Sequence, residues 1–298
     1  MPAGGKLGAG AAASARWCGG RAPVSERAAT QFSREGTLAA VMATRERVVH
    51  ALLMRELQTR FGRSNFGFLW LFFEPMMLGG LVGGLHAIQA GGDHDMAGMP
   101  GVSIIFFFMV GYVPYFMFRS MIGRAASAIH SNLSLLYHRD VLLVDIMIAR
   151  NLIEYFAICG VMVTMVTFGA WATGRLPDGP LKLAVALMLM ALLSHGISMI
   201  IAAGAAVSDF VERIVHPMTY IMMPLSGAFF MVHTLPPQVQ DFMLWIPLVN
   251  IHELAREGQF GAVVRAQYDL VYVGQWILGS NFLGLMALRV ARPRLHMY

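Results

Sequence analysis

One short segment of the chain resembles a metal-binding motif, and it runs from His252 to Arg256 as HELAR. A zinc site of the H-E-x-x-H type needs two histidines one helical turn apart, with the glutamate between them as general base. Arg256 stands where the second histidine is required, so we predict no metal site here. We expect instead a polar network, with a solvated turn as the alternative, and its members would be Asn250, His252, Glu253, Arg256 and Glu257.

A second unusual feature is the pair Glu74 and Pro75 inside an apolar run. A carboxylate at full depth in a bilayer costs roughly 2.5–3.5 kcal/mol, so Glu74 should not face lipid. Pro75 removes a backbone hydrogen bond and can kink a helix. We interpret the pair as a structural gate. The alternative is a proton carrier, which would need several acids at membrane depth, and Glu154 is the other obvious one.

Long apolar stretches determine the fold class, because a helix that crosses a bilayer needs about 20 mostly apolar residues. We predict an all-α, polytopic membrane protein with six transmembrane helices, at about 66–90, 101–123, 152–174, 181–207, 214–233 and 270–289. Between the last two, an apolar but proline-interrupted segment predicts re-entrant outer helices before the final span. The polar network around His252 would then lie at the external mouth.

The basic residues predict the orientation of these spans. When all Lys and Arg are sorted onto alternate sides, four fall outside, namely Arg175, Lys182, Arg256 and Arg265. By the positive-inside rule, both termini are cytoplasmic. The sequence pI of about 9.5 then reflects attraction to anionic lipid, and we expect no nucleic-acid partner. The two cysteines, Cys18 and Cys159, offer no disulfide framework.

The first part of the chain differs from the rest in composition. Residues 1–41 are rich in Gly, Ala, Ser and Arg, so we expect a disordered head, and Met42 is an alternative true start. Residues 42–298 form one transmembrane domain. It opens with an interfacial helix at 44–63, in which Val49, Leu53 and Leu57 recur at every fourth residue.

Four blocks of sequence resemble one family. They are similar to blocks of ABC-2 type permeases. The blocks are RELQTRFGRSNFGFLWLFFEP from Arg55, YHRDVLLVDIMIARNLIE from Tyr137, HTLPPQVQDFMLWIPLVN from His233 and HELARE from His252. The nearest resemblance is to the inner-membrane subunits of capsular polysaccharide exporters. It covers the chain from about Met42 to its end.

The resemblance implies a homodimeric permease that works with a dimer of ABC ATPase subunits and moves a polysaccharide, often lipid-anchored, out of the cytoplasm. It also allows periplasmic and outer-membrane export partners. The chain contains no G-x-x-x-x-G-K-[ST] loop, so we expect ATP and Mg on the partner subunit, and no enzyme activity or cofactor in this chain. The candidates for ATPase coupling are Arg55, Arg60, Arg63, Tyr137, His138, Arg139, Asp140 and Asp145.

The candidates for a channel or gate are aromatic and polar. Sugars slide well on flat aromatic faces. The set is Trp70, Glu74, Pro75, Tyr112, Tyr115, Trp245, Asn250, His252, Glu253 and Arg256, although Trp and Tyr also mark membrane interfaces. The alternatives for cargo are O-antigen, teichoic acid or a small molecule. An integral membrane transferase is the alternative from another class, and it would require a converging acid and base cluster.

Overall fold

The computed structural model describes residues 26–61, 65–92, 95–96, 99–137 and 141–292 of the 298. Contacts divide the chain into two units, Met1–Thr44 and Arg45–Tyr298, and the second contains the functional sites discussed below. The described residues are almost all helical, as the sequence predicts. The strands among them are β1 (Asp95–Met96) and β2 (Met99–Ser103), which form an antiparallel hairpin that the sequence analysis did not anticipate.

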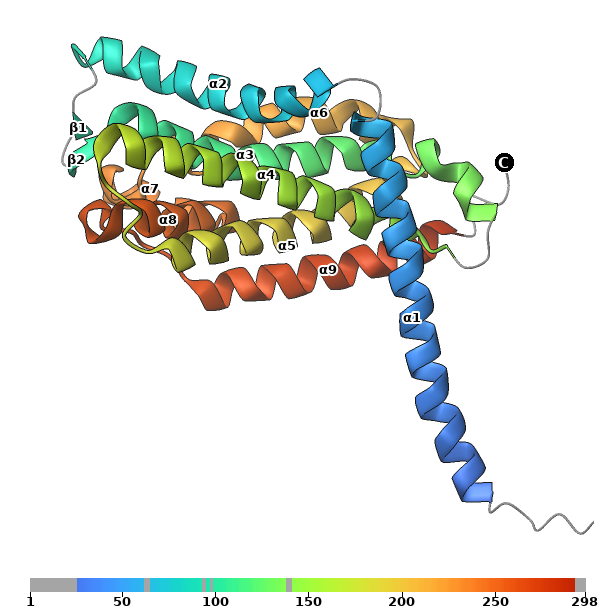
Figure 1. The fold of residues 1–298 in the computed structure, drawn as a ribbon. Helices are drawn as coiled ribbons and strands as arrows, with labels where there is room; N and C mark the ends of the chain where they lie inside the picture. Colours follow the sequence, from blue (N-terminus) through green and yellow to red (C-terminus); the bar gives the residue numbers. More distant parts are fainter. Residues whose placement is uncertain (1–25, 62–64, 93–94, 97–98, 138–140, 293–298) are drawn as a thin grey trace, which may run out of the picture. The chain divides into compact units, whose positions relative to one another are not determined.

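The elements follow one another as a series of helices. They are α1 (Glu26–Phe61), α2 (Asn65–Gln89), α3 (Ile104–Ala126), η1 (His130–Tyr137), α4 (Leu143–Thr173), α5 (Pro180–Ala205), α6 (Asp209–Leu225), η2 (Val232–Thr234), α7 (Pro237–Leu244), α8 (Pro247–Phe260), η3 (Gly261–Val264) and α9 (Leu270–Ala291). Helices α3, α4, α5 and α9 run alongside one another (Figure 1). The hairpin, α7 and α8 lie together at one end of this bundle, and η1 lies at the other.

Within the described residues, four helices are long and apolar enough to cross a membrane, namely α3, α4, α5 and α9. Their bounds agree with the predicted spans, except that α4 begins at Leu143 rather than near residue 152. Helix α2 matches the predicted first span in position, and it contains Pro75. Helix α6 ends at Leu225, well before residue 233, since Gly227 turns the chain with a φ of 84°.

The beginning of the predicted interfacial helix was wrong, because α1 starts at Glu26 and passes through Thr44. The segment before Thr44 has no proline and is rich in good helix formers, so the helix continues through it. The predicted apolar stripe holds only in part, since Leu53 packs against the cluster that Leu52 forms with α4. Leu52 is buried against Ile146 and Ala149 of α4, whereas Leu57 is exposed. Residues 1–25 lie outside the described residues, so their disorder stays a prediction.

Glycines allow two pairs of helices to approach closely. A Cβ on Gly83 would lie 2.8 Å from the Cα of Ile105, so α2 and α3 meet at their backbones. A Cβ on Gly196 would lie 2.7 Å from the backbone nitrogen of Asn281, so α5 and α9 also meet at their backbones.

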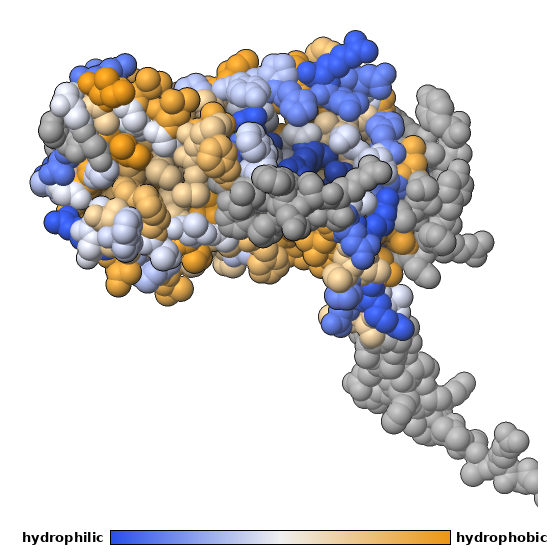
Figure 2. Space-filling view, turned by 45° about the horizontal axis from the view of Figure 1, so that its top comes forward, coloured by the Kyte–Doolittle hydropathy of each residue, from blue (hydrophilic) through white to orange (hydrophobic). Residues whose placement is uncertain are grey.

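Figure 2 shows the polarity of the surface, where apolar residues cover the middle of the bundle and hydrophilic residues gather toward its ends.

Candidate functional site

A charged contact joins α1 to the beginning of α4. The Arg45 guanidinium lies 2.8 Å from the carboxylate of Asp145, whose side chain is 7% exposed. The same carboxylate accepts a hydrogen bond of 3.0 Å from the backbone N–H of Leu142, and so it caps the first turn of α4. An acid in this position is favoured by the unsatisfied N–H groups and by the helix dipole. Asp145 therefore fixes the start of α4 and holds α1 at once.

Two further contacts strengthen the same junction. Arg150 of α4 lies 3.3 Å from the carboxylate of Glu56 of α1, and both side chains are largely buried, at 15% and 16% exposure. Arg55 donates a 2.7 Å hydrogen bond to the side-chain oxygen of Asn132 in η1. Together with buried Leu52, these contacts hold the second half of α1 against both η1 and α4.

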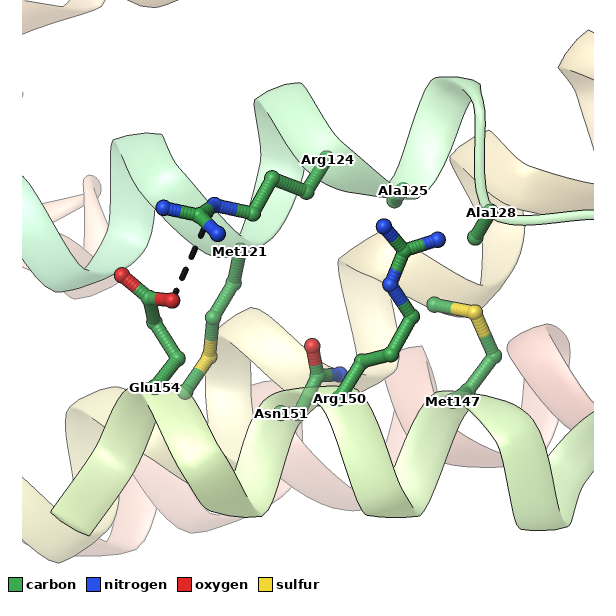
Figure 3. A pocket seen from close by; sticks show the side chains of 8 residues that line it. All are labelled: Met121, Arg124, Ala125, Ala128, Met147, Arg150, Asn151 and Glu154. Atoms are coloured by element: carbon green, nitrogen blue, oxygen red, sulfur yellow. Dashed lines mark ion pairs between the residues drawn. The ribbon is translucent and has the colours of Figure 1, made fainter. Parts of the chain in front are cut away.

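A second ionic contact lies between α3 and α4. Arg124 approaches the buried carboxylate of Glu154 at 3.7 Å, and Ser120 donates a hydrogen bond to that carboxylate. Figure 3 shows Arg124 reaching from α3 toward Glu154, while Arg150 and Asn151 extend from α4 along the same small hollow. Chains of ion pairs therefore connect α1, α4 and α3 at the same end of the bundle.

The predicted coupling residues fall partly within this junction. Arg55 and Asp145 belong to it through the contacts described above. The side chains of Arg60, Arg63 and Tyr137, and all of His138, Arg139 and Asp140, lie outside the described residues. Their role stays a prediction.

The aromatic candidates occupy different surroundings. Tyr115 is fully buried and donates a hydrogen bond to the backbone carbonyl of Thr219, so it fastens α3 to α6. Tyr112 is also buried and stacks on Phe229 at 6.4 Å between ring centroids. Trp70 and Trp245, in contrast, are 55% and 75% exposed. On α2, Glu74 is half-buried and Pro75 is buried.

Arg256 forms the centre of a buried polar network on α8. Its side chain is fully buried, and its guanidinium donates hydrogen bonds to the carbonyls of Gly227, Ala228 and Phe230, the first at 2.7 Å. The guanidinium also lies over the ring of Phe107, 4.0 Å from its centroid. Such carbonyls at the end of α6 would otherwise be unpaired, and an unpaired buried carbonyl costs about 1–3 kcal/mol.

The neighbouring side chains satisfy the backbone in the same way. Glu253 accepts hydrogen bonds from the N–H groups of Val232, at 2.8 Å, and Gln267, at 3.0 Å. Asn250 accepts one from Asp269 at 2.8 Å. Because these side chains and that of Arg256 are buried, a solvated turn was wrong for them and the predicted polar network is confirmed at these positions. The fifth predicted member, Glu257, is half-buried and contacts Lys182 and Tyr268 instead. The network anchors the chain on both sides of α8.

Burial determines the protonation of this network. Burial and the charge of Arg256 lower the pKa of His252 to about 4, so His252 is neutral at pH 7. Burial raises the pKa of Glu253, against the opposing effects of the two N–H groups and Arg256. Burial also lowers the pKa of Arg256 to about 10, which still leaves it charged.

Sequence reasoning sorted Arg119 with the cytoplasmic arginines and gave it no role of its own. The structure places Arg119 inside α3, where it donates a 2.8 Å hydrogen bond to the hydroxyl of Tyr220 and a 3.4 Å bond to that of Tyr112. The available signal was its position, directly after a long apolar run.

Comparison with known proteins agrees with this architecture. The chain is 36% identical over 241 residues to the capsule polysaccharide export inner-membrane protein CtrC of Neisseria meningitidis serogroup B, which covers 80% of this chain and 86% of the relative. It is 35% identical over 265 residues to BexB of Haemophilus influenzae, a protein with the same description, which covers 87% and 96%. It is 29% identical over 248 residues to the polysialic acid transport protein KpsM of Escherichia coli, which covers 81% and 92%.

The match to a family model covers the elements described above. Residues 47–260 match the model of the ABC-2 type transporter, which includes the charged junction, the helices α2 to α6 and the polar network on α8. The resemblance noted in the sequence is thereby confirmed. The chain belongs to the ABC-2 type transporter family.

Proposed function

We propose that this chain is the permease subunit of an ATP-driven exporter that moves capsular polysaccharide across a bacterial inner membrane. The observation that carries the proposal is the near full-length similarity to two relatives described as capsule polysaccharide export inner-membrane proteins, at 36% and 35% identity. The apolar helices of the bundle support a place in the membrane.

The proposal includes six spans, with α2 and α6 added to the four apolar helices. The 25 residues of α2 rise about 37 Å, which exceeds the roughly 30 Å of a hydrocarbon core. Helix α6 has 17 residues and ends at Leu225, and the chain turns at Gly227 before η2, which supports a broken final approach to the outer side. Helices α7 and α8 would then form the re-entrant outer segment, and both termini would be cytoplasmic.

The charged junction is the proposed entry point of the ATPase stroke. The sequence contains no phosphate-binding loop of the G-x-x-x-x-G-K-[ST] type, so ATP and Mg would be bound by a dimer of partner subunits against a homodimer of this chain. The contacts Arg45 with Asp145 and Glu56 with Arg150 tie α1 to α4. A push on the loop between η1 and α4 would therefore move both helices together.

The polymer path is proposed along the face formed by α2, α3 and α6. Trp70 is exposed on α2, and Glu74 is half-buried one helical turn further on. Helices α2 and α3 are in extensive contact, and α6 packs on α3. Glu74 and Pro75 are the proposed gate of this path. Any periplasmic or outer-membrane export partner would meet the end that carries the hairpin and α7.

Deletion of the gene in its own bacterium, with complementation, tests the proposal. Loss of the permease should abolish surface polysaccharide and cause polymer to accumulate inside the cell, and the accumulated polymer identifies the cargo. Unchanged surface polysaccharide would refute the export role, and accumulation of O-antigen or teichoic acid would change the cargo. Purification of the complemented protein should also recover an ATPase subunit. Catalytic turnover by the purified chain alone would favour a transferase.

The predicted contact with the ATPase has its own test. Arg139→Glu combined with Asp140→Lys should leave membrane insertion normal and abolish ATPase recovery or export. Wild-type recovery, ATP hydrolysis and export in this variant would move the contact to Arg55 and its neighbours on α1.

A further inference from the structure

Arg119 is a charged side chain within a membrane-spanning candidate, and its side-chain partners in the described part of the chain are tyrosines. It lies seven residues before Ala126, the last residue of α3, or about 10 Å from the end of the helix. Its guanidinium reaches the hydroxyls of Tyr112 and Tyr220 and lies over the ring of Tyr220, 4.5 Å from its centroid. Among the residues that the structure describes, Arg119 makes no ion pair with a carboxylate.

Two neighbouring arginines on α3 and α4 differ in this respect. Arg124 is paired with Glu154, and Arg150 is paired with Glu56. An ionised side chain in a span is costly, and it is usually paired or faces a water-filled path. Two neutral hydroxyls satisfy hydrogen bonds of Arg119 but leave its charge uncompensated, so a negative partner from outside the described chain would stabilise it.

The group is accessible from one side. Tyr220 is 54% exposed, and its neighbours Met218 and Ile221 on α6 are 46% and 58% exposed. On the other side, Tyr112 is buried and stacks on Phe229. Arg119 therefore contacts a buried tyrosine, Tyr112, on one side and an exposed tyrosine, Tyr220, on the other.

Glu74 is the nearby acid that could oppose this charge. It lies within electrostatic reach of the Tyr112 hydroxyl, as does Arg119, yet it makes no ion pair with a described residue. Among the described residues, no ion pair therefore joins Glu74 to Arg119.

We propose that Arg119, with Tyr112 and Tyr220, binds the carboxylate of an acidic sugar as the polymer passes along α3 and α6. The inference rests on the proposed export function and adds the residues that would contact an acidic group of the polymer. The planar guanidinium forms paired hydrogen bonds with a carboxylate. The exposed ring of Tyr220 presents a flat apolar face to sugar C–H groups. Since one charge is contacted at a time, the polymer can move on without dissociating.

Binding by the purified full-length protein tests the proposal. The protein, in nanodiscs of phosphatidylcholine, is titrated with a fluorescent oligomer of sialic acid and with a neutral glucan oligomer of equal length. We expect Arg119→Gln to weaken binding of the acidic oligomer about tenfold or more, and Arg119→Lys to weaken it less. Binding of the neutral oligomer should change little. Equal affinity of the wild-type protein and Arg119→Gln for the acidic oligomer would overturn the proposal.

Matched variants separate charge from fold. Arg289→Gln removes an exposed arginine from the last turn of α9 and should leave both affinities unchanged. If Arg119 serves only to balance Glu74, then Glu74→Gln combined with Arg119→Gln will restore wild-type binding of the acidic oligomer, and the proposal fails. Under the proposal the double variant binds the acidic oligomer as weakly as Arg119→Gln alone.

A lipid phosphate has related chemistry, and a change of lipid distinguishes it. In nanodiscs that contain phosphatidylglycerol, wild-type affinity for the acidic oligomer should stay above that of Arg119→Gln. If it falls to the level of that variant, lipid occupies Arg119 and the assignment to the polymer is wrong. A failure here leaves the export role to be judged by the gene deletion, which measures surface polymer and does not depend on Arg119.

Discussion

Replacement of Arg256 by methionine should destabilise the protein severely although it removes a buried charge. Three backbone carbonyls, those of Gly227, Ala228 and Phe230, lose their donor, and each unpaired buried carbonyl costs about 1–3 kcal/mol. Relief from burying the guanidinium offsets part of this cost. A net loss of about 3 kcal/mol is the expected result.

The assay is thermal unfolding of the detergent-purified protein, followed by the fluorescence of a thiol probe on Cys159 as this half-buried residue becomes accessible. Arg256→Met should lower the midpoint by several degrees and reduce the amount of protein in the membrane. Arg256→Lys should also be destabilising, because one ammonium group cannot reach all three carbonyls. The control is Arg175→Met, which removes an exposed arginine at the same end of the bundle. If Arg256→Met unfolds like the wild-type protein, the network does not anchor α8.

Three further predictions concern neighbouring features. His252 has a pKa of about 4 in the folded protein and 6.5 in the unfolded chain, so the stability that it contributes is present above pH 6.5 and is lost as the pH falls toward 4. Between pH 7.5 and 5.5, the free energy of unfolding of the wild-type protein should fall by about 1 kcal/mol more than that of His252→Gln. Equal losses would contradict the assignment. Gly83→Leu should separate α2 from α3 and lower the unfolding midpoint, whereas Gly84→Leu, where nothing lies within 4 Å, should not; equal midpoints would show that the close approach is unimportant. Single cysteines at residues 94 and 140 should react with impermeant reagents from opposite sides of the membrane, and same-side labelling would refute the predicted topology.

The helices of the bundle were predictable because their signal is local. Length and apolar composition alone identify α3, α5 and α9 to within a few residues. The early start of α4 could not be predicted in this way. Its first turns contain Asp145 and Arg150, and the charges of these residues are compensated by residues of α1 far away in the sequence. Hydropathy contains no information on such partners.

Among the polar residues as well, local features could be predicted and long-range partners could not. The spacing of His252, Glu253 and Arg256 excluded a zinc motif and indicated a polar network, which the structure confirms. The partners of that network are backbone groups at the end of α6, and their position depends on the tertiary fold. Arg119 was given no role of its own, because the positive-inside rule sorts arginines by side and does not measure depth.

Exchange of the two charges that join α1 to α4 tests the central proposal, that these helices transmit the ATPase stroke as one body. Export of polymer and ATP hydrolysis are measured in Glu56→Arg, in Arg150→Glu and in the double variant. Each single variant places like charges at the 3.3 Å contact, so export per ATP hydrolysed should fall while the protein still inserts. The double variant restores opposite charges and should recover most of the export. Wild-type export in both single variants, or no recovery in a stably inserted double variant, would contradict the account.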